Sequence, residues 1–256
     1  MTTKTMTDVP ISSAIVSRSA GASDIFLVCE HASNHIPESY NNLGLSAPDL
    51  RSHIAWDPGA YGVALHLSEL LDAPLVAGGI SRLVYDCNRP PEAAGAMPAR
   101  SETYDIPGNA NLSHADKSAR IADVYTPFKD TLAETLANSK ASVLITVHSF
   151  TPVFQGQSRS VEIGVLHDQD SRLADAILAC AKAHTDLKVL RNKPYGPEDG
   201  VTHTLREHGI KQGLHNVMLE IRSDLIATLQ EQASMAQMLA ALLLDAVAAT
   251  QAEAST

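Results

Sequence analysis

Ser142-Val143-Leu144-Ile145-Thr146-Val147 decides the fold, because a run of mostly apolar, β-branched residues is typical of a strand buried on both faces of a sheet. The polar pair His148-Ser149 follows this run directly. A second and wholly apolar run, Ile25-Phe26-Leu27-Val28-Cys29, ends in the same way at Glu30-His31. Since open α/β sheets bind ligands at the carboxyl ends of their strands, these two polar pairs are the first candidates for chemistry.

Helical patterns alternate with further strand-like runs along the chain. Expected helices cover residues 59–71, residues 171–183 and an Ala/Leu-rich segment that runs to the C-terminus, and further expected strands cover residues 75–77, 82–85, 161–166 and 217–221. Ser113 and Asp116 have the spacing of a capping box, and Pro127 should kink the helix that they open or start a second one.

This alternation predicts the fold class. Strands separated by helices form an α/β fold, here a single domain with a central mixed, mostly parallel sheet flanked by helices. We expect the domain to cover residues 24–250, and residues 1–23, which are rich in Ser and Thr, to form a flexible N-terminal tail.

The charge balance limits the possible partners. The chain has 19 Lys and Arg against 29 Asp and Glu, a net charge of −10, and no Lys/Arg-rich run. Nucleic acids and anionic membranes attract basic patches, so we expect neither as a partner.

The cysteines and the apolar segments favour a cytoplasmic protein. Three cysteines, Cys29, Cys87 and Cys180, fit neither a paired-cysteine metal site nor a complete disulfide framework. The N-terminal residues lack the pattern of a secretory signal. The most apolar segment, residues 238–249, is too short to span a bilayer and contains Asp245, so we expect a helix packed on the protein.

Two further carboxylates join the polar pairs at the strand ends. Glu220 ends the apolar run 217–219, and Asp57 precedes the helix expected from residue 59. Two histidines, one carboxylate and an open position make a hydrolytic zinc site, and another carboxylate can then accept the proton of the attacking water. Any one histidine taken alone is better explained as a hydrogen-bonded residue at a strand end, but the occurrence of two of them after separate strands favours a metal site.

Motifs for other chemistry are weaker. Ser149 is adjacent to His148 in sequence, which does not bring hydroxyl and imidazole into contact, and no Gly-x-Ser-x-Gly elbow occurs. Cys29 and Cys87 lie in apolar runs and are expected to be inert buried thiols. The chain also has no Gly-x-Gly-x-x-Gly and no phosphate-binding Gly-Lys-Ser/Thr loop, so nothing favours a nucleotide cofactor.

Residues 81–90, Ser-Arg-Leu-Val-Tyr-Asp-Cys-Asn-Arg-Pro, form a conspicuous polar segment. On an extended strand, alternation would place four of its residues on one face: Arg82, Val84, Asp86 and Asn88. The planar fork of arginine suits a substrate carboxylate, and the alternative is surface arginines paired with acidic neighbours. Residues 194–200 are rich in turn formers and predict an active-site loop, after which His203 can line the pocket as a substrate contact or proton shuttle.

Taken together, these segments resemble the N-formylglutamate amidohydrolase family. The matching stretches occur in the family's order and are residues 30–37 (Glu-His-Ala-Ser-Asn-His-Ile-Pro), 56–59 (Trp-Asp-Pro-Gly), 81–89, 147–149 (Val-His-Ser) and 219–222 (Leu-Glu-Ile-Arg). They span roughly residues 25 to 226, most of the chain. The resemblance implies a fold similar to the zinc carboxypeptidases and aspartoacylases, with one metal, Zn²⁺ or another divalent ion, at the strand ends.

The resemblance also implies roles for individual residues. The implied zinc ligands are His31, Asp57 and His148. Glu220 is similar to the general base, Asn88-Arg89 is similar to the pair that holds a substrate carboxylate in the related hydrolases, and Arg82 is similar to its helper. Most of the other histidines carry no expected role, although His35 is a candidate for supporting the metal ligands.

The chain departs from the family's pattern at two positions. The commoner first motif is Pro-His-Ser-Gly, whereas Glu30 precedes the histidine here and Ala32-Ser33 follows it. Carboxypeptidase-like enzymes take their metal carboxylate three residues after the first histidine, where this chain has Asn34. Asp57 is therefore the expected carboxylate ligand, with Glu30 in reserve.

The expected function is that of a cytoplasmic zinc amidohydrolase of amino-acid catabolism, such as histidine degradation. Its substrate would be a small anionic N-acyl amino acid such as N-formylglutamate, cleaved to formate and the free amino acid. Two alternatives stay open: a zinc hydrolase of another N-acyl amino acid or peptide amide, and a metal- or amino-acid-binding homologue without catalysis. The sequence does not give the oligomeric state.

Overall fold

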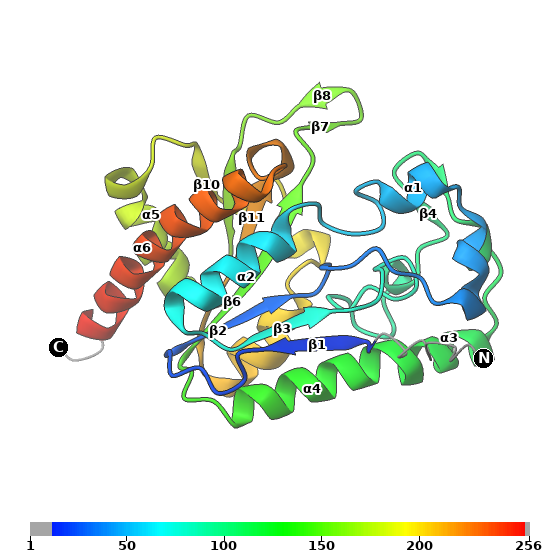
Figure 1. The fold of residues 1–256 in the computed structure, drawn as a ribbon, viewed down its shortest axis with the longest axis horizontal. Coiled ribbons are helices and arrows are strands. Elements are labelled where there is room, and N and C mark those ends of the chain that lie inside the picture. Colours follow the sequence, from blue (N-terminus) through cyan, green and yellow to red (C-terminus); the bar gives the residue numbers. More distant parts are fainter. Residues whose placement is uncertain (1–11, 254–256) are drawn as a thin grey trace, which may run out of the picture.

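A seven-stranded sheet runs through the centre of the structure, a computed structural model that describes residues 12–253 (Figure 1). In spatial order its strands are β1 (Ala14–Ser17), β3 (Leu75–Gly78), β2 (Ile25–Cys29), β6 (Val143–Phe150), β11 (His215–Arg222), β9 (Ile163–Leu166) and β10 (Val189–Arg191). β3, β2, β6 and β11 are parallel, whereas β1 runs antiparallel to β3 and β9 antiparallel to β11. The predicted mixed, mostly parallel sheet is confirmed.

Helices cover both faces of this sheet (Figure 1). The α-helices are α1 (Ala47–Arg51), α2 (Ala60–Leu71), α3 (His114–Arg120), α4 (Thr126–Ala137), α5 (Arg172–His184) and α6 (Leu229–Glu253). α2, α5 and α6 pack on one face, and α4 packs on the other. Successive side chains of a strand point to opposite faces of the sheet. Leu27 of β2 therefore packs in the core on the side of α2, α5 and α6, and Phe26 and Val28 pack in the core on the side of α4.

Smaller elements connect these layers. The two hairpins pair β4 (Arg100–Ser101) with β5 (Tyr104–Asp105) and β7 (Val153–Phe154) with β8 (Gln157–Ser158). Short 3₁₀- or π-helical turns cover Glu38–Gly44, Ala94–Ala96, Pro107–Asn109, Ile121–Tyr125, Pro197–Asp199, Leu205–Gly209, Ile210–Gln212 and Ser223–Leu225.

Most predicted elements are found with small shifts at their ends. The capping box is present, because Ser113 Oγ accepts from the Asp116 N–H at 3.1 Å and the Asp116 carboxylate accepts from the Ser113 N–H at 2.9 Å. Pro127 lies in the first turn of α4, where its missing N–H costs no helical hydrogen bond. β6 continues to Phe150, three residues beyond the predicted strand end, so His148 belongs to the strand itself.

The predicted strand over residues 82–85 is wrong, because this segment is a series of turns. Two side chains close the turns: Ser81 Oγ accepts from the Leu83 N–H at 3.2 Å, and Asp86 Oδ1 accepts from the Asn88 N–H at 3.0 Å. Such local side-chain bonds offer the backbone an alternative to a sheet. The expected alternation of residues 82–88 on one strand face is therefore wrong as well.

The N-terminal tail also differs from the prediction. Ala14–Ser17 forms the edge strand β1, antiparallel to β3, although residues 1–23 were expected to be a flexible tail. Residues 1–11 lie outside the part of the chain that the structure describes. A four-residue strand at a sheet edge has a weak local signal, because its stability comes from a partner about 60 residues later.

α6 is longer than the apolar segment 238–249 that the sequence picks out. By length and composition alone it is a candidate membrane span, and half of its most apolar window is buried inside the protein. Leu239, Leu243 and Ala246 lie in the core that α6 shares with α2 and α5. This packing agrees with the expected helix on the protein.

Candidate active site

A cavity of about 450 Å³ opens at the carboxyl ends of β2, β6 and β11. Seven of the eight sequence-predicted site residues line this cavity. They come from five separate segments of chain and are His31, Asp57, Arg82, Asn88, Arg89, His148 and Glu220. Glu220 of β11 is the register partner of His148 of β6, so two predicted residues are neighbours across adjacent parallel strands. The topology thus gathers the predicted residues as the strand-end argument requires.

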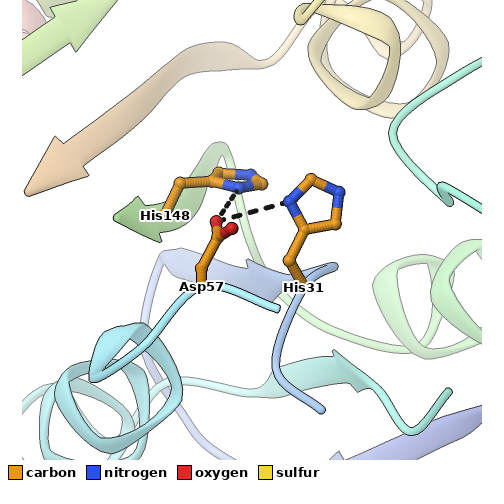
Figure 2. Close-up of side chains that lie close together, drawn as sticks. All are labelled: His31, Asp57 and His148. Atoms are coloured by element: carbon orange, nitrogen blue, oxygen red, sulfur yellow. Dashed lines mark hydrogen bonds and ion pairs between the residues drawn. The ribbon is translucent and has the colours of Figure 1, made fainter. Parts of the chain in front are cut away.

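His31, Asp57 and His148 form the centre of this site (Figure 2). Both histidines turn Nδ1 toward the same carboxylate oxygen: Asp57 Oδ2 lies 3.3 Å from His31 Nδ1 and 2.9 Å from His148 Nδ1. The two rings meet edge to face with centroids 4.8 Å apart. All three side chains are at least 96% buried.

Backbone contacts fix Asp57 between the histidines. Its N–H donates to the His31 carbonyl at 2.9 Å, and its Oδ2 also accepts from the Ser149 N–H at 3.3 Å. The chain then turns through Gly59, whose φ of 83° lies in the left-handed region, into α2. A Cβ at Gly59 would lie 2.4 Å from the Ile226 carbonyl oxygen, so only glycine fits at this turn.

Each histidine turns its second nitrogen toward another carboxylate. His31 Nε2 lies 2.7 Å from Asp86 Oδ1, and His148 Nε2 lies 3.1 Å from Glu30 Oε2, at ion-pair distance but without the alignment of a hydrogen bond. A carboxylate at Nε2 favours the tautomer that carries hydrogen there and leaves the Nδ1 lone pair available. Glu30 therefore faces the far side of His148, and Asp57 is the carboxylate that faces both Nδ1 atoms.

The site concentrates negative charge in a buried space. Glu30, Asp57, Asp86 and Glu220 are each no more than 5% exposed, and Arg82 bridges two of them, with 3.3 Å to Asp57 Oδ1 and 2.7 Å to Asp86 Oδ2. Burial alone would raise the carboxyl pKa values, yet the charges of His31 and Arg82 lower the pKa of Asp86 well below its usual range. Conversely, burial would lower the pKa of His148, but Glu30 and Asp57 raise it well above its usual range.

Glu220 differs from the other carboxylates in the pocket. Among residues 12–253 it makes no ion pair, and its Oε2 is buried without a hydrogen-bond partner there. Burial raises the pKa of Glu220 to about 7, with the charge of Asp57 adding to the shift and that of His148 opposing it. A carboxyl group that titrates near neutral pH can both accept and return a proton.

The donor set fits a divalent metal ion. One ligand atom from each of His31, Asp57 and His148 can be chosen so that all lie within 4.8 Å of one another. Buried polar atoms without partners surround this centre, namely both oxygens of Glu30, His148 Nε2 and Glu220 Oε2. Two imidazoles and a carboxylate are a ligand set that zinc accepts in hydrolytic sites, and a cation would offset the excess of buried carboxylates.

The predicted substrate-binding residues have distinct surroundings. Arg82 is held by Asp57 and Asp86, as described above. Asn88 donates to the Val201 carbonyl and accepts from the Thr204 N–H at 3.0 Å, so its amide mainly holds the segment after the turn-rich loop. Arg89 donates to the Asp199 carbonyl at 2.6 Å and makes no ion pair with any residue in the described part of the chain.

The structure does not bring His203 to the pocket wall. Its Nε2 lies 2.8 Å from the Tyr125 hydroxyl, and it is not among the residues that line the cavity. His203 instead contacts Tyr125, which ends the turn Ile121–Tyr125, and its position in the sequence does not reveal this contact.

The sequence missed two residues of the pocket. Asp86, which holds His31, was placed only on a strand face, although the Asp-x-Asn turn signal at residues 86–88 was visible. Tyr195 lines the cavity from the turn-rich loop that was predicted to belong to the active site.

Comparisons with known proteins agree with this geometry. The N-formylglutamate amidohydrolase family model matches residues 23–227, well over half of the chain. A solved structure of the gene product Atu2144 from Agrobacterium tumefaciens is 54% identical, with a TM-score of 0.91 over 94% of this chain and 96% of that one.

More distant similarity supports the fold. The N-formylglutamate amidohydrolase from Ralstonia eutropha JMP134 is 15% identical, with a TM-score of 0.62 over 95% of this chain and 100% of that one. No curated protein sequence matches the chain. The chain belongs to the N-formylglutamate amidohydrolase family and is a hydrolase of amide C–N bonds.

Proposed function

We propose that this protein is a zinc-dependent amidohydrolase that cleaves N-formylglutamate, or a closely related N-acyl acidic amino acid, to formate and the free amino acid. The observation that carries the proposal is the buried His31–Asp57–His148 cluster with the unpaired carboxyl of Glu220 in the same cavity. Family membership limits the bond to an amide.

We assign His31 Nδ1, Asp57 Oδ2 and His148 Nδ1 as the metal ligands. Zinc bound there would supply Lewis acidity, polarising the substrate carbonyl and making an attacking water more acidic. Asp86 and Glu30 face the Nε2 atoms of His31 and His148 and orient the two imidazoles. Arg82 donates to Asp57 Oδ1, which leaves Asp57 Oδ2 for the metal.

Glu220 is the proposed general base. Its raised pKa lets it take a proton from the attacking water and give it to the leaving amine nitrogen, so that one residue serves both steps. Arg89, free of any ion pair, binds a carboxylate of the substrate, and Asn88 fixes the backbone beside it.

The cellular setting proposed from the sequence is the cytoplasm, in amino-acid catabolism such as histidine degradation. The three cysteines are all free in the structure, and Cys29 and Cys87 are buried, which is compatible with a reducing compartment.

The decisive measurement is release of formate from N-formylglutamate by the purified protein, with and without a chelator, alongside its zinc content. We expect chelation to abolish turnover and zinc to restore it. His148→Ala should lose both zinc and activity. Stoichiometric zinc without hydrolysis of any acyl amino acid would instead favour a binding protein.

A further inference from the structure

Two arginines beside the cavity have no carboxylate within ion-pair distance among the residues that the structure describes. Arg89 lines the cavity, and Arg159 follows the β7–β8 hairpin, from which Phe154 also lines the cavity. Their neighbour Arg82 pairs with two carboxylates, and Arg100 at the cavity mouth pairs with Asp105. In a chain with a net charge of −10, two unpaired arginines at one pocket call for an anionic ligand.

Arg159 is held by aromatic rings instead of an acid. Its guanidinium lies 4.5 Å from the centroid of the Phe154 ring, 4.9 Å from that of Tyr195 and 5.5 Å from that of Phe150. It donates to the Thr151 carbonyl at 3.3 Å and to the Tyr195 hydroxyl oxygen at 3.0 Å. These contacts fix the cation in place but leave its charge without a counterion.

The contact with Arg159 sets the direction of the Tyr195 hydroxyl. Because the oxygen accepts from Arg159, its own hydrogen is left to donate elsewhere, and Tyr195 lines the cavity. Burial, followed by the negative charge of Glu220, raises the pKa of Tyr195, so the hydroxyl keeps its hydrogen at neutral pH. Tyr195 is therefore a donor that faces the same cavity as Glu220.

A single short loop joins the two arginines. Tyr195 contacts Arg159 near the start of the loop, and the Asp199 carbonyl accepts from Arg89 near its end. The turn Pro197–Asp199 is closed by the Asp199 carboxylate, which accepts from the Gly196 N–H at 2.9 Å. The loop thus holds two donor sites at a fixed separation on the cavity wall.

We propose that Tyr195, positioned by Arg159, binds the second carboxylate of a dicarboxylic N-acyl amino acid whose first carboxylate binds Arg89. This rests on the proposed function, and it assigns the selectivity for an acidic side chain to the Tyr195 end of the loop. Tyr195 is a specificity-determining residue that touches the substrate, and Arg159 is a positioning residue that acts through it.

The test compares N-formylglutamate with N-formylglutamine, in which a neutral amide replaces the side-chain carboxylate. The wild-type zinc enzyme should favour N-formylglutamate, mostly through a lower KM. Tyr195→Phe and Arg159→Gln should each reduce that preference by about tenfold or more, as expected for a lost charge-assisted hydrogen bond. Their kcat/KM for N-formylglutamine should fall by a smaller factor than that for N-formylglutamate, since an amide oxygen accepts a weaker hydrogen bond than a carboxylate does.

Arg172→Gln is the matched control, because this first residue of α5 pairs with Asp170 and does not line the cavity. It should leave the preference unchanged. An unchanged preference in both Tyr195→Phe and Arg159→Gln would overturn the proposal. An equal loss of kcat/KM for both substrates, together with a lower Tm, would also overturn it. Arg159 and its aromatic neighbours would then only stabilise the β7–β8 hairpin.

Affinity measurements test the dicarboxylate site independently of the proposed hydrolysis. Calorimetric titration of both compounds into zinc-loaded Glu220→Gln protein measures affinity without turnover. Tighter binding of N-formylglutamate that Tyr195→Phe abolishes supports the dicarboxylate site even if the wild type hydrolyses neither compound. Turnover of both compounds with equal affinity would leave the amidohydrolase standing and refute the dicarboxylate site.

Discussion

Glu220 and Asp57 are carboxylates in one cavity, and their surroundings give them opposite proton affinities. Asp57 Oδ2 lies 3.3 Å from His31 Nδ1 and 2.9 Å from His148 Nδ1, and these two imidazoles lower the pKa of Asp57 although burial opposes them. Glu220 has no such donors, and burial raises its pKa to about 7. A carboxylate that stays charged suits a metal ligand, and one that titrates suits a proton carrier.

Replacing Glu220 by Gln should remove the proton carrier and keep the ligand set. We expect kcat to fall by about 10²- to 10⁴-fold, the usual contribution of a general acid or base. Zinc content should remain close to one per chain. Formate release and metal analysis on the same sample check both points, and turnover within a few-fold of the wild type would remove Glu220 from the mechanism.

The same substitution should stabilise the metal-free protein above neutral pH. Because folding raises the pKa of Glu220 from 4.5 to about 7, the folded state binds the proton more tightly, and stability falls as pH rises between these values. Glu220→Gln removes this loss, so its free energy of unfolding at pH 8 should exceed that of the wild type by about 1–3 kcal/mol. Urea unfolding at pH 4.5 and pH 8, in chelator, measures the difference, which should be small at the lower pH.

Asp86→Asn tests how His31 is held. Its Oδ1 lies 2.7 Å from His31 Nε2, and an amide there can present either hydrogen or oxygen, which weakens control of the tautomer. We expect zinc affinity to fall by about 10- to 100-fold, as is common when such a partner is lost. Competition with a chromogenic chelator measures this directly. Asp105→Asn, which affects only an exposed pair with Arg100, is the control and should leave zinc affinity unchanged.

For individual residues, the sequence predicted which side chains belong to the candidate site better than it predicted which side chains they contact. His31, Asp57, His148 and Glu220 were predicted because strand ends and short motifs mark them, and they meet in the structure. Arg82 was predicted to bind substrate, but its bonds to Asp57 and Asp86 depend on how residues 81–88 turn. The aromatic surroundings of Arg159 join the hairpin to the loop after β10, which no local pattern encodes.

Among the elements, the buried strands and amphipathic helices were predictable, and the turns that shape the pocket were not. β2 and β6 carry wholly buried apolar runs, so their periodicity and composition agree with their environment. Residues 82–85 alternate apolar and polar side chains as a strand would, but Ser81 and Asp86 close turns on either side. Short alternation is therefore a weak signal wherever Ser, Asp or Asn can bond to the backbone.

The turn into α2 gives a prediction for an element. Gly59→Ala places a side chain at a left-handed φ and against the Ile226 carbonyl, so it should destabilise the protein by about 2–4 kcal/mol. Gly156→Ala, in the β7–β8 turn, has a similar φ of 77° and no atom within 4 Å, so it should cost only about 1–2 kcal/mol. Equal Tm values for the two variants would contradict the role assigned to the close approach.

For the whole molecule, the class of fold was predictable from the sequence, but the order of the strands was not. Strands that pair, such as β2 with β6 and β6 with β11, are separated by long stretches of chain. No local sequence pattern indicates that β9 runs antiparallel to β11. The chain has 11 histidines, and two of them, His31 and His148, lie in the candidate metal centre.

Metal removal should lower the thermal stability of the entire domain. A ligand that binds only the folded state at 1,000 times its Kd stabilises by about 4 kcal/mol, which is roughly 10 °C in Tm for a chain of this size. We therefore expect thermal unfolding in excess zinc to lie well above unfolding in chelator. Asp57→Asn should lose most of this difference, and an identical Tm with and without zinc in the wild type would argue against the proposed centre.

The direct pairing of Glu220 with His148 on adjacent strands has a consequence for engineering. The separation of the proposed base and the proposed ligand is set by two paired strands of the central sheet, whereas Tyr195, Phe154 and Arg89 reach the cavity from a loop, a hairpin and a turn. Libraries restricted to these peripheral segments should yield hydrolases of altered substrate range with the bond-breaking apparatus intact. Bond cleavage and substrate choice would then be separately adjustable parts of one cavity.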